Sequence, residues 1–319
     1  MYNILSLKER NFKMRIMFMG TPDFARVNLE KLVECGYEVC CAVSQQDKPQ
    51  GRKMVLTPPP VKEYALSKNI PVLQPQTLKD GAFMSELKQY DPELIIAVAY
   101  GKILPKYVLD YPKLGCINVH GSLLPKYRGS APVQWAVING DKETGVTTMY
   151  MDEGMDTGDI LMQKKFDIAE NETSGMLMER MAGIGADLLI ETLNNLDKIT
   201  PVSQNENEAT YAPMLKKEMG KIDWTKSAEK IKSLVYGMNP WPTAFFETDK
   251  CTVKVFKADV SFVKTDKKPG IVVSADKTLD ISTGNGVLII KELQLQGKKR
   301  MNVADFLRGN KIETGTAVY

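Results

Sequence analysis

The stretch Arg15–Ser44, RIMFMGTPDFARVNLEKLVECGYEVCCAVS, carries the pattern that decides the fold. Arg15–Met19 is apolar after its first residue and is typical of a buried strand, and Glu38–Ser44 is a second segment of this kind. The segment between them predicts a helix, with Thr21 as its N-cap, Pro22 in its first turn and Gly36 at its C-terminal cap. A strand, a helix and a strand in this order predict parallel strands joined by a crossover helix.

The same alternation continues to about residue 200 and predicts an α/β fold with a doubly wound, Rossmann-like sheet. Further strands are expected at residues 71–73, 93–99, 116–120, 147–151 and 160–166, and a long helix at residues 173–196. Ligands bind beyond the carboxyl ends of the strands in such sheets. We therefore expect functional residues directly after the strands 93–99 and 116–120.

The last third of the chain has a different pattern. Residues 201–213 are polar without periodicity and predict a linker between a domain at residues 14–200 and a second one at 214–319. The second domain is expected to hold one helix at 227–236 and β runs at 244–247, 252–256, 270–273, 278–282 and 286–295. Such short runs separated by turn residues predict a small barrel or sandwich. Residues 1–13 are polar and are interpreted as an N-terminal extension.

Composition excludes several classes of protein. The chain of 319 residues contains a single histidine, His120, so a zinc site built on two or three histidines is impossible. Its five cysteines form no Cys-x-x-Cys pair, which favours reduced thiols and a cytoplasmic protein. We see no signal peptide and no apolar stretch that approaches the ~20 residues of a membrane helix.

The charge of the chain is unevenly distributed. Residues 211–319 contain 19 Lys and Arg against 12 Asp and Glu, whereas residues 1–210 contain 23 against 27. A basic third attracts polyanions, although a solvated lysine-rich surface explains it equally well. Fingerprints for dinucleotides, for a phosphate-binding loop and for a nucleophilic serine elbow are all missing from the sequence.

Asn118 and His120 are the strongest catalytic candidates. They alternate onto one side of the strand 116–120 at its carboxyl end. An amide donor beside an imidazole suits the stabilisation of an oxyanion at a carbonyl carbon. The alternative is that Asn118 caps a turn and that His120 is a core residue.

Two further segments carry charge. The acidic run Met151–Asp159 is interpreted as an acidic turn, as a weak cation loop, or as the source of a carboxylate that orients His120. The long loop at residues 46–60 contains Lys48, Arg52 and Lys53, and it favours either contacts with phosphates or a mobile solvated loop.

Six motifs together resemble the methionyl-tRNA formyltransferase family, from Met14 nearly to the C-terminus. They are Gly20-Thr21-Pro22-Asp23-Phe24, Gln46-Asp47-Lys48-Pro49 with Gly51-Arg52, Ala99-Tyr100-Gly101 with Ile103-Leu104-Pro105, Asn118–Gly129, Met151–Ile160 and Asn239-Pro240-Trp241-Pro242. The Asn-x-His with a downstream Asp is shared with other 10-formyltetrahydrofolate-dependent transferases. The basic loop and the basic third indicate the enzyme that acts on tRNA.

The resemblance implies a formyltransferase domain, an OB-like β-barrel that helps to bind tRNA, and formyl transfer from 10-formyltetrahydrofolate to the α-amine of methionyl-initiator tRNA. It implies that Asn118, His120 and Asp156 are catalytic, in a monomer that uses no metal and no membrane. The implied folate-binding residues are Ser122, Leu123, Leu124, Pro125, Tyr100, Gly101, Ile103 and Leu104. The implied tRNA-binding residues are Arg52, Lys53 and Lys48.

The chain departs from the family pattern after Gly51-Arg52, where many relatives continue with Gly-Lys-Lys and this chain has Lys53-Met54-Val55. Its loop is therefore less basic. Two alternatives remain open at this point. One is a formyltransferase acting on a small amine such as a nucleotide-sugar or glycinamide ribonucleotide, and the other is a non-catalytic RNA-binding protein.

Overall fold

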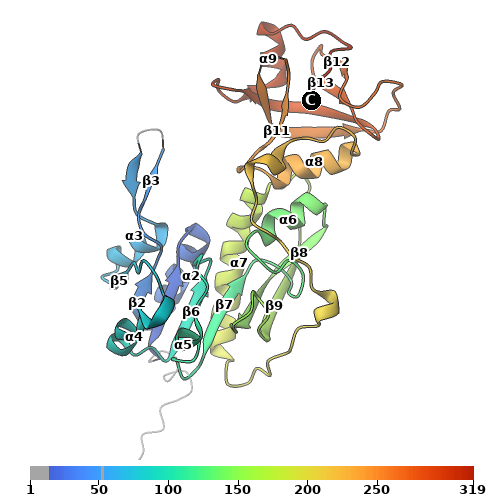
Figure 1. The fold of residues 1–319 in the computed structure, drawn as a ribbon. Helices are drawn as coiled ribbons and strands as arrows, with labels where there is room; N and C mark the ends of the chain where they lie inside the picture. The colour runs from blue at the N-terminus through green and yellow to red at the C-terminus, as the bar shows by residue number, and fades with distance from the viewer. Residues whose placement is uncertain (1–13, 52–53, 250) are drawn as a thin grey trace, which may run out of the picture. The chain divides into compact units, whose positions relative to one another are not determined.

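The computed structural model describes residues 14–51, 54–249 and 251–319 (Figure 1). These residues form two compact units that interleave along the chain. The first comprises the described residues up to 129 together with 144–166 and 178–211, and the second comprises 130–143, 167–177 and 212–319. The predicted extension at residues 1–13 lies outside the described residues.

The first unit contains a seven-stranded sheet with the order β5-β2-β1-β6-β7-β8-β9. Its elements, of which β8, β9 and α7 cross the limits of the unit by a few residues, are β1 (Ile16–Gly20), α2 (Asp23–Glu34), β2 (Val39–Val43), β3 (Lys48–Gln50), β4 (Val55–Thr57), α3 (Pro60–Ser67), β5 (Val72–Leu73), α4 (Met84–Tyr90), β6 (Leu94–Val98), α5 (Lys106–Leu109), β7 (Cys116–His120), β8 (Glu143–Tyr150), β9 (Ile160–Asp167) and α7 (Ser174–Asn194). The strands from β5 to β7 are parallel and β8 is antiparallel to β7. The expected Rossmann-like sheet is confirmed.

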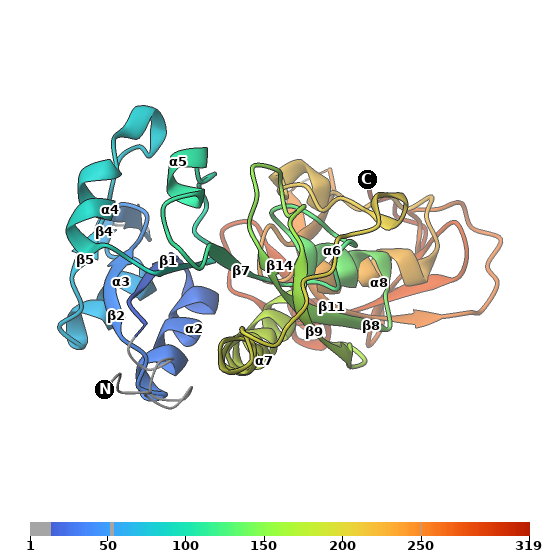
Figure 2. The ribbon, with the colours of Figure 1, turned by 90° about the horizontal axis from the view of Figure 1, so that it is seen from below.

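Apolar side chains on both faces hold this sheet. Every residue of β1 and β6 is buried, as expected for central strands covered on both sides. Figure 2 shows α4 and α5 over one face of the sheet and α2 and α7 over the other. Strand β7 therefore ends, at His120, in a sheet that helices cover on both faces.

The start of α2 differs from the prediction. The helix begins at Asp23, and Thr21 does not cap it. The Thr21 hydroxyl instead donates to the carbonyl of Tyr100 at 3.1 Å and accepts from the amide of Gln45 at 3.3 Å. The hydroxyl joins the segments that leave β1, β2 and β6, so a contact between strand ends replaces the local cap. The predicted C-terminal glycine is confirmed, because Gly36 follows the helix with a φ of +83°.

The second unit is built on an antiparallel sheet with the order β10-β11-β14-β13-β12, to which β15 adds beside β14. Its elements are α6 (Pro132–Asn139), α8 (Ala228–Gly237), β10 (Ala244–Glu247), β11 (Thr252–Ser261), β12 (Val272–Ser274), β13 (Leu279–Ser282), β14 (Val287–Leu295), β15 (Met301–Asn302) and α9 (Val303–Gly309).

The C-terminal residues close this sheet. Tyr319 and Glu247 exchange two backbone hydrogen bonds of 2.9 and 2.7 Å at one edge. Val272 at the other edge donates to Thr316 at 2.9 Å and accepts from Gly315 at 2.9 Å. Residues 315–319 therefore bond to both edge strands, and the expected barrel-like domain is confirmed.

Candidate active site

Asn118 and His120 lie on the same side of β7, where the sequence placed them. Asn118 pairs with Ala97 of β6, and His120 pairs with Thr147 of β8. The His120 side chain is 7% exposed and Asn118 is half-buried. Two strands thus fix the backbone under both side chains.

Each nitrogen of the His120 ring faces a different kind of oxygen. Nε2 lies 2.9 Å from the carbonyl oxygen of Tyr127. A carbonyl only accepts, so Nε2 carries the hydrogen of this bond. Nδ1 then faces the Asp156 carboxylate, with Oδ2 3.7 Å away. This pair becomes an ionic one whenever the ring is protonated at both nitrogens.

Asp156 brings the third side chain of the site. Its Oδ2 accepts the amide hydrogen of Gly129 at 2.8 Å, and its Oδ1 lies 3.5 Å from Asn118 Nδ2. The residue has a φ of +54°, in the left-handed region that non-glycine residues seldom occupy. The carboxylate therefore lies between the amide of Asn118 and the ring of His120.

The other acidic residues of the run have separate partners. Asp152 Oδ1 accepts from the amide of Gly154 at 3.0 Å and from the hydroxyl of Thr157 at 2.6 Å, which makes it part of the turn. Asp159 accepts from Ser203 at 2.8 Å. Within the part of the chain that the structure describes, no group of three metal-ligating side chains is found. The run combines a turn with one carboxylate directed at His120.

The loop after β7 holds four of the residues that the resemblance assigned to folate. Ser122 is fully buried, and its hydroxyl donates to the carbonyl of Lys126 at 2.6 Å. Leu124 is also buried and its amide donates to Thr147 at 3.2 Å, whereas Leu123 and Pro125 are half-buried. The bonds of Ser122 and Leu124 hold the shape of the loop.

The loop after β6 holds the other four. Tyr100 and Leu104 are buried in the core of the first unit, and burial raises the pKa of Tyr100 to about 12. Ile103 is 80% exposed, and Gly101 is exposed with a φ of +82°. Ile103 and Gly101 therefore offer contact surface, while Tyr100 and Leu104 anchor the loop.

The basic loop contains a hairpin that the sequence analysis did not predict. Strand β3 pairs with β4, and Figure 1 shows the hairpin extending away from the sheet of its own unit. At its base Lys62 Nζ lies 2.8 and 2.9 Å from the carboxylate oxygens of Asp47, and this contact lowers the pKa of Asp47. Lys48 is exposed on β3, whereas Arg52 and Lys53 lie outside the described residues.

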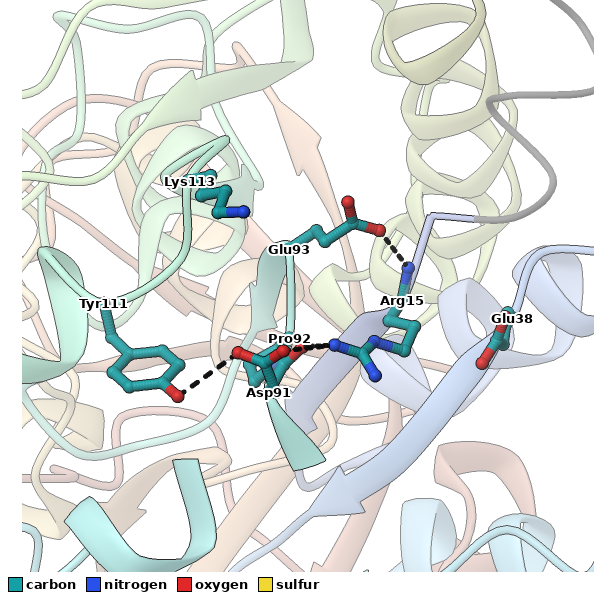
Figure 3. A pocket seen from close by; sticks show the side chains of 7 residues that line it. All are labelled: Arg15, Glu38, Asp91, Pro92, Glu93, Tyr111 and Lys113. Carbon is teal, nitrogen blue, oxygen red and sulfur yellow. Dashed lines mark hydrogen bonds and ion pairs between the residues drawn. The ribbon is translucent and has the colours of Figure 1, made fainter. Parts of the chain in front are cut away.

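A polar cavity of about 510 Å³ lies elsewhere on the first unit (Figure 3). It is lined by Arg15, Glu38, Asp91, Pro92, Glu93, Tyr111 and Lys113. Arg15, Glu38 and Glu93 directly precede β1, β2 and β6, so the cavity is at the amino ends of the strands. It contains none of the predicted site residues.

Sequence analysis missed three residues around Asp156. Gln204 Nε2 donates to the carbonyls of Asp156 and Gly158 at 2.9 and 2.7 Å. Gln204 is in turn bonded to the buried Arg128, which also binds Glu206. Gln204 and Glu206 fall in a stretch with no periodic signal, and nothing in the sequence distinguishes the buried Arg128 from the nearby Lys126.

Comparison with known proteins identifies the family. Residues 14–193 match the family Formyl transferase, and residues 214–311 match Formyl transferase, C-terminal domain. The methionyl-tRNA formyltransferase of Lachnospira eligens is 49% identical over 310 residues, covering 95% of this chain and 98% of the relative. That of Desulfotalea psychrophila is 50% identical over 308 residues, covering 96% and 95%. The chain belongs to the methionyl-tRNA formyltransferase family.

Solved structures agree with this family at the level of the fold. The methionyl-tRNA formyltransferase of Clostridium thermocellum aligns with a TM-score of 0.52 at 24% identity, covering 79% of this chain and 95% of that one. An N-formyltransferase of Helicobacter canadensis, solved with folinic acid and dTDP-3-aminofucose, aligns with a TM-score of 0.66 at 18% identity, covering 87% and 98%.

Proposed function

We propose that the protein transfers the formyl group of 10-formyltetrahydrofolate to the α-amino group of methionyl-initiator tRNA. The observation that carries this proposal is the convergence of Asn118, His120 and Asp156 at the carboxyl end of β7, in a chain about half identical to methionyl-tRNA formyltransferases. The basic composition of residues 211–319 and the exposed hairpin lysine Lys48 support a polyanionic acceptor.

The chemistry required is addition of an amine to a formyl carbon, followed by departure of the folate nitrogen. The negative charge that develops on the formyl oxygen needs donors that are already in place. Asn118 Nδ2 has two hydrogens, and its contact with Asp156 at 3.5 Å leaves it available. Nδ1 of a protonated His120 supplies the second donor from the same side of the strand.

Asp156 has two roles in this proposal. Its charge stabilises the protonated ring of His120 across the 3.7 Å separation, and its carboxylate accepts the proton that the attacking amine must lose. That proton then reaches the departing nitrogen of the folate, so that no net charge is left on either product group. Long contacts in the absence of substrate are common in sites that tighten around it.

The folate is expected to lie along the loops that follow β6 and β7. Exposed Ile103, open Gly101 and the half-buried Leu123 and Pro125 would contact it. These residues fit an apolar ring system with a polar edge, because they combine aliphatic surface with the backbone groups of two loops.

The test compares the rate of formyl transfer to methionyl-initiator tRNA with the rate of transfer to methionyl-elongator tRNA. We expect efficient transfer to the initiator and at least tenfold lower kcat/KM with the elongator. Equal rates with both, or transfer only to a small amine such as a nucleotide-linked amino sugar, would remove tRNA from the proposal. Failure to bind folate would remove the transferase activity altogether.

A further inference from the structure

Residues 202–211, which belong to the predicted linker at 201–213, contact residues of the candidate active site in the first unit, and we refer to them as the arm. Val202 exchanges two backbone hydrogen bonds with Ile160, of 2.8 and 2.9 Å. At the other end of the arm, Thr210 accepts from the amide of Arg128 at 2.8 Å through its carbonyl. Its hydroxyl accepts from the amide of Tyr127, also at 2.8 Å.

Arg128 anchors the middle of the arm. Its side chain has no exposed surface, and a buried guanidinium requires partners for its hydrogens. Glu206 takes two of them at 2.7 and 2.9 Å, and this pairing lowers the pKa of the Glu206 carboxyl. Gln204 Oε1 takes two more at 2.9 and 3.0 Å.

These bonds determine the orientation of the Gln204 amide. Because Oε1 faces the guanidinium, the NH₂ group faces the opposite way, toward the carbonyls of Asp156 and Gly158. A flipped amide would place hydrogens against a cation and an oxygen against two carbonyls. Arg128 therefore sets which end of Gln204 reaches the Asp156 backbone.

The bond to Asp156 matters because that backbone is left-handed. At a φ of +54° the carboxylate contacts Gly129, Asn118 and His120, and this conformation costs an L-residue free energy that bonds to its surroundings must offset. The arm also holds Tyr127, whose carbonyl orients the His120 ring. Both groups that orient His120 are thus attached to the arm.

We propose that Arg128 and Gln204 are positioning residues of the active site, which hold Asp156 in its left-handed conformation so that its carboxylate faces Asn118 and His120. The inference rests on the proposed function for its kinetic consequences. The positioning itself concerns the free protein and can be observed without turnover.

The sharpest variant is Gln204→Glu. A glutamate keeps an acceptor for Arg128 but has no hydrogen for the carbonyls of Asp156 and Gly158. We expect kcat to fall by about 10–100-fold with the KM for both substrates changed less than threefold. The matched control is Glu208→Gln on the same arm, since Glu208 contacts only Asn205 in the hydrogen bonds of the described chain, and it should keep wild-type kcat.

A double-mutant cycle separates positioning from general loss of structure. In a protein that already carries Asp156→Ala, Gln204→Glu should cause no further loss of kcat, because the group that it positions is gone. A loss of equal size in both backgrounds would overturn the proposal. A wild-type kcat in the single variant Gln204→Glu would also overturn the proposal.

A second readout uses the single histidine. In protein labelled with ¹⁵N-histidine, the ring signals report on His120 alone, and we expect Gln204→Glu to shift them in the direction produced by Asp156→Ala.

Gln204→Met, which keeps the length of the side chain but bonds neither Arg128 nor the carbonyls of Asp156 and Gly158, serves as a second variant should the glutamate unfold the chain. Unshifted ring signals in a folded variant would refute the positioning role, even if the wild type proved inactive on tRNA. If the wild type is inactive on tRNA but the ring signals of Gln204→Glu are shifted, only the proposed function is contradicted.

Discussion

The two ring nitrogens of His120 have different surroundings, and each has a different chemical consequence. The bond from Nε2 to the carbonyl of Tyr127 sets the ring orientation and the tautomer. The separation of 3.7 Å between Nδ1 and Asp156 Oδ2 is longer than a hydrogen bond, so Nδ1 stays available to a substrate atom. A residue held in this way can act as a donor to a developing oxyanion without reorganising first.

We predict that His120→Ala and Asp156→Asn each lose about 10²–10³ in kcat, the effect typical of removing one group that stabilises an oxyanion. Single-turnover formylation of charged initiator tRNA measures it, with circular dichroism to verify the fold. The matched control is Asp152→Asn in the same acidic run, since its contacts to Gly154 and Thr157 form only the turn. Turnover near the wild-type rate in His120→Ala would disprove its role.

At this scale strand alternation predicted Asn118 and His120 as candidates, and the acidic run predicted only a carboxylate near His120. The choice of Asp156 within that run came from the resemblance to the family. Gln204 and Glu206 could not be predicted, since their partner Arg128 is 76 and 78 residues away in the chain. A contact between two irregular segments leaves no periodic pattern. The buried charge of Arg128 becomes visible only in three dimensions.

At the scale of elements, glycines show where packing restricts helix α7. An ideal Cβ on Gly183 would meet no atom within 4 Å, whereas one on Gly185 would lie 3.1 Å from Val119 and 3.4 Å from Val146. The two positions lie in the same helix and differ only in what they face. Gly185 allows the helix to approach the strands beneath it.

We therefore predict that Gly183→Ala raises the free energy of unfolding by about 0.5–1 kcal/mol. The reason is that alanine loses less backbone entropy than glycine when the helix forms. Gly185→Ala should raise the free energy of unfolding by less than this or lower it, because the new methyl group would press against Val119 and Val146. Urea denaturation followed by circular dichroism compares the two variants. A larger gain for Gly185→Ala than for Gly183→Ala would contradict this account of the packing.

Most elements could be predicted because their apolar periodicity is strong. The central strands β1, β6 and β7 fall within one residue of the expected ranges. Hairpin β3–β4 was missed because each of its strands has only three residues, which is too short for an alternating apolar and polar pattern to show. Thr21 was misassigned as a cap because its hydroxyl serves two distant strand ends instead.

At the scale of the whole molecule, the distribution of charge is the property that local structure does not explain. Residues 211–319 carry a net charge of +7 by formal count, and Lys48 is exposed on the hairpin of the first unit. Among the residues that the structure describes, none of the helices combines the length and apolar character that crossing a membrane requires. In the proposed function, contact with the phosphates of the tRNA accounts for this charge.

Binding of initiator tRNA should therefore depend steeply on salt, because each phosphate contact releases condensed counterions. We predict that Arg52→Ala weakens binding at every salt concentration and reduces the slope of log Kd against log salt by about 1. Filter binding across a range of potassium chloride concentrations measures both quantities. The control is Lys88→Ala, which removes the same charge from the exposed face of α4. An equal change in slope for both variants would show that the effect comes from net charge and not from the basic loop at residues 46–60, and an unchanged slope in Arg52→Ala would exclude a phosphate contact by Arg52.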